Sequence, residues 1–262
     1  MKRPVILELD APPASPAEAP PVIDQPAFDA APEGRAMQIA AKLASRQRSR
    51  VTRFFWQATG ALVGFLIGVV LAYLMSLQLR QFGAESFIVN ILGISLIREL
   101  GPMLAAILVA GRSGSAITAQ IGVMRVTEEL DAMRVMGIPH GFRLVLPRAL
   151  ALMLAMPLIS VWTTLAALAG GMLAADLTMG ITPAYFAQAL PRAVQVSNLY
   201  LALGKSAVFG VMIALIGCHW GLRVKPNTQS LGEGTTASVV NAITVVILVD
   251  ALFAILFKNV GV

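Results

Sequence analysis

The sequence contains few of the residues from which catalytic and metal centres are built. Its 262 residues include one cysteine, Cys218, and two histidines, His140 and His219. A single cysteine excludes an internal disulfide, and two histidines argue against a metal site or an acid–base centre. We therefore expect no catalytic residue, no metal ligand and no cofactor in this chain itself.

Charged residues are also scarce, and this scarcity indicates the class of protein. Only 13% of the residues are charged and 57% are hydrophobic, which is typical of a protein that crosses a membrane several times. The net charge of +6 does not indicate nucleic-acid binding, because Lys and Arg stand near the ends of apolar runs, as the positive-inside rule requires. The N-terminal segment lacks the apolar stretch of a cleavable signal peptide.

The N-terminal part consists of two segments of different composition. Residues 1–34 are rich in Pro, Ala and acidic side chains, which predicts a disordered cytoplasmic tail. Residues 35–53 combine apolar residues at helical spacing with several Lys and Arg, which predicts a basic amphipathic helix on the membrane surface. A simple basic cluster beside the membrane is the alternative, and either interpretation places the N-terminus in the cytoplasm.

Residues 54–262 form the expected membrane domain. Their long apolar runs predict an all-α membrane protein with five spans, a cytoplasmic N-terminus and an external C-terminus. The expected spans are Phe54–Leu79, Glu99–Met124, Ala149–Ala175, Asn198–Leu222 and Ala237–Phe257.

The segments between the spans carry their own predictions. Residues 82–97 are only moderately apolar and suit a re-entrant or interfacial element better than a span. The external loop 176–197 holds a short helix around Tyr185–Leu190, and residues 223–236 form a cytoplasmic loop. Within the first span, Gly60, Gly64 and Gly68 lie four apart, which favours close approach of another helix; ordinary glycine use in a membrane helix is the alternative.

Five charged residues stand within or beside the apolar runs: Arg98, Glu99, Arg112, Lys205 and Asp250. Such groups are costly in a membrane unless they pair or face a polar cavity. One interpretation is that they pair and lock helices together. The other is that some of them line a cavity that receives a lipid headgroup, where Lys205 and Arg98 meet an anionic phosphodiester.

The run Gly204-Lys205-Ser206 resembles the end of a nucleotide-binding P-loop. Leu199 stands where that motif requires glycine, and the run lies in an apolar span. We therefore expect that this chain does not hydrolyse ATP.

The polar segment Thr127–Met136 predicts a short cytoplasmic helix with Thr127 as its N-cap. Its apolar side is expected to dock in a groove of a cytoplasmic ATPase; an ordinary surface helix is the alternative. The candidate docking residues are Thr127, Glu128, Glu129, Leu130, Asp131, Met133, Arg134 and Met136.

Four stretches carry a resemblance to a known family. RELGP at 98–102, AGRSGSAITAQIG at 110–122, MRVTEELDAMRVMGIP at 124–139 and GTTASVVNAITVVILVD at 234–250 are similar to the MlaE-type permeases of lipid-transporting ABC systems. The resemblance covers about four-fifths of the chain. The N-terminal tail lies outside it, where some relatives carry a folded regulatory domain.

The resemblance implies a homodimer of permeases in the bacterial inner membrane. A cytoplasmic ABC ATPase dimer, which holds ATP and Mg, docks beneath it, and a periplasmic MCE-domain protein sits outside. A phospholipid occupies an outward-open cavity between the permeases. The residues that match positions around that cavity are Arg98, Glu99, Lys205, Asp250 and Phe82.

Other classes of function remain as alternatives. An ion-coupled secondary transporter would use Glu99 and Asp250 as ion sites, although no internal repeat is visible. An intramembrane enzyme lacks a nucleophile–base or metal constellation. A structural scaffold would need Lys205 for assembly rather than for transport.

Overall fold

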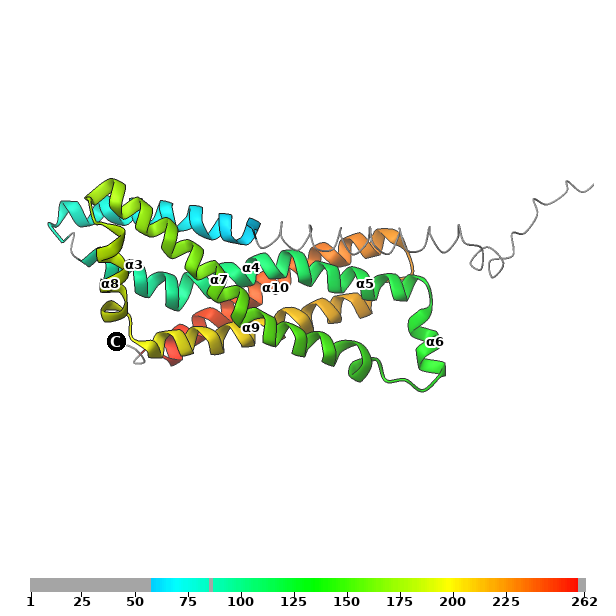
Figure 1. Cartoon of the computed structure of the whole chain (residues 1–262). Coiled ribbons are helices and arrows are strands. Elements are labelled where there is room, and N and C mark those ends of the chain that lie inside the picture. The colour runs from blue at the N-terminus through cyan, green and yellow to red at the C-terminus, as the bar shows by residue number, and fades with distance from the viewer. Residues whose placement is uncertain (1–57, 85–86, 259–262) are drawn as a thin grey trace, which may run out of the picture. The chain divides into compact units, whose positions relative to one another are not determined.

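The computed structural model describes residues 58–84 and 87–258, so the predictions for residues 1–34 and 35–53 lie outside the described residues. Every regular element of the described part is a helix (Figure 1). Five helical stretches are long and apolar enough to cross a membrane: Ala58–Gln81, Ile88–Val126, Gly141–Met179, Val196–Arg223 and Thr228–Leu256. The predicted all-α fold with five spans is confirmed.

The second span is a composite helix of 39 residues. At about 1.5 Å per residue it extends for about 58 Å, well beyond the hydrocarbon thickness of about 30 Å. It consists of α3 (Ile88–Ile94), a π-helical turn (Ser95–Leu100), α4 (Gly101–Val109), a second π-helical turn (Ala110–Gly114) and α5 (Ser115–Val126).

The prediction of a separate re-entrant or interfacial element at residues 82–97 is wrong from residue 88 onward, where the chain is already part of the second span. Ile88, Val89, Leu92 and Leu96 are almost fully buried, and their spacing gives one buried helical face. Part of this face packs on α8, so the segment continues the second span instead of ending before it.

The remaining helices follow the chain in order. They are α6 (Glu129–Val135), α7 (Leu146–Met179) preceded by a π-helical turn (Gly141–Val145), α8 (Pro183–Ala193), α9 (Val196–Arg223) and α10 (Thr228–Leu256). The predicted short helix in the 176–197 loop is confirmed as α8.

The expected loop at residues 223–236 is mostly helix. The Asn227 side chain accepts a hydrogen bond from the Ser230 amide at 2.7 Å, which caps the first turn of α10. Only residues 224–227 separate α9 from α10, so these two spans are joined tightly.

Glycine controls the contact between the Ala58–Gln81 helix and α7. A Cβ atom on Gly68 would collide with the Ala167 backbone carbonyl, and one on Gly64 would lie 2.8 Å from the Thr163 carbonyl oxygen. The predicted close approach is therefore confirmed at these two positions. Gly60 differs, because its nearest neighbour would be Leu108 Cδ1 at 3.9 Å.

Helix α9 forms the centre of the bundle and packs against α4, α5, α7 and α10. Phe209 and Ile213 are fully buried there against Met156 of α7. Thr118 Oγ1 of α5 lies 2.8 Å from Ser238 Oγ of α10 and 3.0 Å from the Gly217 carbonyl oxygen of α9. This buried polar contact fixes the three helices relative to one another.

Candidate functional site

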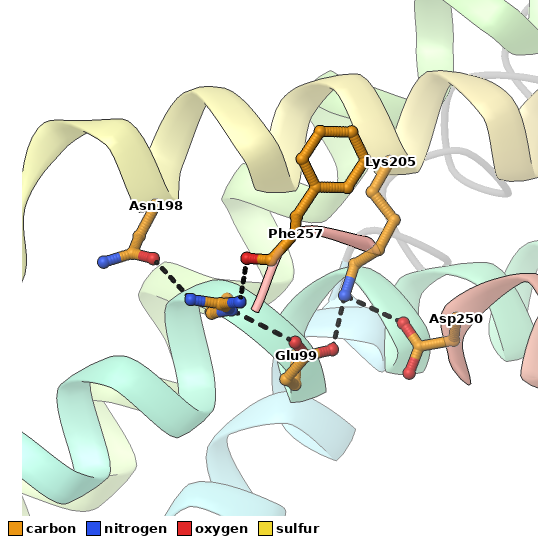
Figure 2. A network of polar contacts seen from close by, with 6 residues as sticks. Glu99, Asn198, Lys205, Asp250 and Phe257 are labelled. Atoms are coloured by element: carbon orange, nitrogen blue, oxygen red, sulfur yellow. Dashed lines mark hydrogen bonds and ion pairs between the residues drawn. The ribbon is translucent and has the colours of Figure 1, made fainter. Parts of the chain in front are cut away.

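Four of the five predicted intramembrane charges meet in one cluster (Figure 2). Arg98 and Glu99 lie in the π-helical turn of the second span, Lys205 on α9 and Asp250 on α10. We call these four residues the charge cluster. It joins three spans that are far apart in the sequence.

Lys205 is the centre of the charge cluster. Its side chain is 1% exposed, and its Nζ lies 2.6 Å from Glu99 Oε2 and 2.8 Å from Asp250 Oδ1. An isolated buried ammonium would be strongly destabilising, so the two carboxylates are what makes this position tolerable. The contact with Glu99 is a hydrogen bond, whereas Asp250 Oδ1 is close enough for an ion pair but forms no aligned hydrogen bond. Glu99 is therefore the stronger partner.

Arg98 connects Glu99 to the ends of α9 and α10. Its Nε lies 3.4 Å from Glu99 Oε1, its Nη1 donates to Asn198 Oδ1 at 3.3 Å and its Nη2 donates to the Phe257 carbonyl oxygen at 2.8 Å. The carbonyl belongs to the residue that follows α10, where unpaired helix carbonyls favour a cation.

Asn198 is a site residue that the sequence analysis missed. It is fully buried on the first turn of α9 and accepts a hydrogen bond from Arg98. A buried amide at the start of an apolar span is itself a signal, because it requires a polar partner.

The charge cluster is electrically balanced, with two cations and two carboxylates. Glu99 is the most accessible member: its side chain is 33% exposed, against 15% for Asp250, 11% for Arg98 and 1% for Lys205. An anion reaching Lys205 must therefore displace or separate a carboxylate. In this state the charges pair with one another and tie helices together.

Two other predicted residues lie outside the charge cluster. Phe82 is in the turn after the first helix and is 79% exposed. Arg112 lies in the second π-helical turn, thirteen residues after Glu99, and borders a separate pocket of about 360 Å³.

The predicted N-cap of the short polar helix is wrong. Thr127 is the residue after α5, where its Oγ1 donates to the Val123 carbonyl oxygen at 3.1 Å. The chain turns at Glu128, whose φ of 62° is left-handed, and α6 begins at Glu129. Thr127 bonds back to the preceding helix because its hydroxyl reaches the carbonyl four residues earlier.

The apolar side of α6 also differs from the expectation. Leu130 is 2% exposed and packs in a core with Ile117 of α5 and Cys218 of α9, so it does not face a partner. The exposed apolar residues are Val135, at 89%, and Met136, at 65%. Met133 is intermediate, and the remaining candidates Glu128, Glu129, Asp131 and Arg134 are exposed.

Asp131 holds the exposed face of α6 in place. It pairs with Arg125 of α5 at 3.1 Å and with Arg134 at 3.7 Å. The pair with Arg125 and the buried Leu130 attach α6 to the end of α5, whereas the pair with Arg134 lies within α6. Figure 1 shows α6 at the end of the bundle opposite α8.

Comparison with known proteins agrees with this architecture. The family profile described as Permease MlaE matches residues 57–256. A probable ABC transporter permease of Synechocystis is 35% identical over 196 residues, which are 74% of each chain. The intermembrane phospholipid transport system permease MlaE of Haemophilus influenzae is 33% identical over 76% of this chain and 77% of its own. The chloroplastic protein TRIGALACTOSYLDIACYLGLYCEROL 1 of Arabidopsis thaliana is 30% identical over 76% of this chain and 57% of its own. With its five spans and this match over most of its length, the chain belongs to the MlaE permease family.

Proposed function

We propose that this permease is the membrane subunit of an ABC transporter that moves phospholipid between the inner membrane and a periplasmic MCE-domain protein. It works as a homodimer, and a separate ATPase supplies the energy. The observation that carries the proposal is the charge cluster, in which a buried ammonium is held by two carboxylates, of which that of Glu99 is partly accessible. A phosphate group is a ligand that can replace a carboxylate on a lysine.

The exposed face of α6 is where the ATPase docks in this proposal. Val135 and Met136 are apolar and exposed on a helix that the rest of the chain holds in place through Leu130 and Asp131. Spaced apolar side chains on a fixed helix suit recognition in a groove. In this proposal α6 lies in the cytoplasm, as expected from the basic residues near the N-terminus.

A single composite helix connects the docking face to the charge cluster. The Ile88–Val126 stretch carries Arg98 and Glu99 near one end and is followed directly by α6 at the other. A displacement of α6 by the ATPase therefore moves Glu99 relative to Lys205. A ligand drives a conformational change only if it binds one of the two states better than the other. In this proposal the better-binding state is the one in which the Glu99–Lys205 ion pair is separated, because separation exposes Lys205 to a lipid phosphate.

The test is co-purification of the permease with its ATPase, followed by mass spectrometry of bound lipid. Wild type retains phospholipid and ATPase. Lys205→Ala loses the lipid and keeps the ATPase, while the double variant Val135→Asp, Met136→Asp loses the ATPase. Lys225→Ala, which removes a lysine outside the charge cluster, is the matched control and behaves as wild type. Absence of both lipid and ATPase from the wild-type sample contradicts the proposal and favours the ion-coupled transporter.

A further inference from the structure

The last span, α10, buries only one narrow face against the rest of the chain. Its buried residues recur every four positions and are Gly234, Ser238, Ala242 and Val246. Elsewhere the helix exposes large apolar side chains, among them Leu248 at 64% and Ile255 at 70%. Apolar side chains are as stable against lipid tails as against another helix, so they do not by themselves indicate a partner.

Asn241 is the residue of the exposed surface of α10 that contact with lipid does not explain. It is exposed, and its Nδ2 donates to the Ala237 carbonyl oxygen of its own helix at 2.9 Å. The side-chain amide also has a second N–H and the acceptor Oδ1, and no hydrogen bond within the described part of the chain uses either. Such groups are destabilising in hydrocarbon unless they find a partner.

The position of Asn241 along α10 places it within the hydrocarbon. The helix has 29 residues, or about 44 Å, so it exceeds the hydrocarbon thickness of about 30 Å by about 14 Å. Asn241 stands thirteen residues after Thr228 and fifteen before Leu256, which is about 20 Å from either end. Because this distance is larger than the excess, Asn241 remains in the hydrocarbon at whichever end the excess protrudes.

The residues around Asn241 have the spacing of a helix–helix contact. From position 237 to position 255, steps of four and three residues alternate, which is the heptad pattern along which two helices pack. The residue at 237 is half-buried and the other five are exposed. We call this set the α10 seam, and it consists of Ala237, Asn241, Thr244, Leu248, Ala251 and Ile255.

The α10 seam is separate from the charge cluster. Asp250 stands nine residues after Asn241, which is two and a half helical turns and puts the two side chains on opposite sides of α10. Lys205 pairs with Asp250 on its side. A contact through the seam therefore leaves the ion pairs of the charge cluster in place.

A partner for Asn241 has to reach hydrocarbon depth and to offer a hydrogen-bond donor and acceptor. Lipid tails offer neither, and the ATPase and the MCE-domain protein of the proposed function lie outside the membrane. A second copy of this chain meets both conditions. A twofold axis perpendicular to the membrane brings two α10 helices together in the same direction, so that each seam residue lies near its own equivalent. The amide is complementary to itself, because it carries both a donor and an acceptor.

We propose that two copies of this permease meet along the α10 seam and that hydrogen bonds between their Asn241 side chains fix the register of the two helices. Asparagine at one seam position is a known determinant of register in parallel helix pairs. The α10 seam presupposes the homodimer of the proposed function and specifies the surface that forms it.

Disulfide cross-linking of the full chain in its membrane tests this contact. Cys218 is the only cysteine of the sequence, so Cys218→Ala supplies a background without thiols. Asn241→Cys and Leu248→Cys, added singly, each place one thiol per copy on the seam. Ile247→Cys, on another side of α10 at 48% exposure, and Leu158→Cys, on α7 at 75% exposure, are the matched controls.

Oxidation is expected to convert Asn241→Cys and Leu248→Cys into covalent dimers that reduction reverses. Ile247→Cys and Leu158→Cys are expected to stay monomeric on the denaturing gel. Native mass spectrometry of the unoxidised proteins measures the oligomeric state independently, and it should give a dimer for wild type and for the Cys218→Ala background.

The hydrogen bond is tested by substitutions of Asn241 in the wild-type chain. Asn241→Leu removes the amide and should raise the dissociation constant of the dimer about threefold, the ratio for about 0.6 kcal/mol per hydrogen bond between membrane helices. Asn241→Gln keeps an amide and should retain most of the affinity. Ile247→Leu, off the seam, should leave the dissociation constant unchanged.

Three results overturn the proposal in distinguishable ways. A dimeric mass without preferential cross-linking at the seam positions places the interface elsewhere and leaves the proposed homodimer intact. A monomeric mass for wild type contradicts both the seam and the homodimer. Preferential cross-linking together with an unchanged dissociation constant for Asn241→Leu assigns the contact to packing and contradicts the role of Asn241.

Discussion

The two ends of the bundle use charge in opposite ways. At the charge cluster, Lys205 is buried and pairs with Glu99 and Asp250 of the same chain. At α6 the charged residues are exposed, and the apolar Leu130 is the buried group. The charges of the charge cluster therefore contact one another inside the bundle, whereas those of α6 form a surface that other molecules can reach. Substitutions in the charge cluster affect stability and ligand binding together, whereas those on the exposed face of α6 separate partner docking from folding.

The largest effect is expected from Lys205→Ala. Removing the ammonium leaves Asp250 without its cation and Glu99 with Arg98 alone, and breaking a buried pair in this way costs about 3–5 kcal/mol. The melting temperature of the purified protein in detergent should fall accordingly. The triple variant Glu99→Gln, Lys205→Ala, Asp250→Asn removes Lys205 together with both of its carboxylates, and Arg98 keeps its hydrogen bonds to Asn198 and Phe257. This variant should recover most of the loss; failure to recover would show that the pairing of Lys205 is not what stabilises this site.

Leu130→Ala should produce the next largest effect, although the residue lies outside the charge cluster. Leu130 is buried against α5 and α9, and truncation of a buried leucine costs about 2–5 kcal/mol. Chemical denaturation of the purified protein measures the loss. A change within the error of the wild-type value would mean that Leu130 faces a partner, as the sequence pattern suggested.

Asn198→Ala should have a smaller effect on the charge cluster. It removes the amide that accepts from Arg98, and a hydrogen bond to a charged group contributes about 1.5–3 kcal/mol. We expect a lower melting temperature and weaker retention of lipid. Asn198→Asp keeps an acceptor and serves as the matched control; if both variants lose stability equally, the hydrogen bond to Arg98 is not the cause.

The smallest effect on folding is expected from Val135→Asp with Met136→Asp. Both side chains are exposed, and surface substitutions usually change stability by less than about 0.5 kcal/mol. The same variant should lose the ATPase in a pull-down assay. If this variant lost its fold together with ATPase binding, the exposed face of α6 would not separate partner docking from folding, and this difference from the charge cluster would be contradicted.

The spans were predictable because each is a long apolar run, which a membrane requires to be helical. The proximity of Glu99, Lys205 and Asp250 could not be predicted, since it depends on how three helices are rotated about their own axes. No local sequence pattern fixes those rotations. The predicted helix boundaries were wrong at two places where a single polar side chain determines where a helix begins or ends. Asn227 extends α10 into the expected loop, and Thr127 bonds to α5 instead of capping α6.

The face of α6 shows a second limit of sequence reasoning. Leu130 and Met136 belong to the same amphipathic pattern, yet one is buried and the other exposed. The sequence pattern predicts that α6 has an apolar side, but it does not predict what that side contacts. The contacts depend on the direction of α6, which the left-handed residue Glu128 sets. A left-handed glutamate is uncommon enough that sequence alone does not predict it.

The central claim is that the charge cluster acts in lipid movement and not only in assembly. ATP-driven transfer of a fluorescent phospholipid, measured in reconstituted vesicles with the ATPase and the MCE-domain protein present, tests it most directly. The triple variant Glu99→Gln, Lys205→Ala, Asp250→Asn is predicted to fold, to bind the ATPase and to lose transfer. Transfer at the wild-type rate by this folded variant would contradict the account and leave the charge cluster a purely structural element.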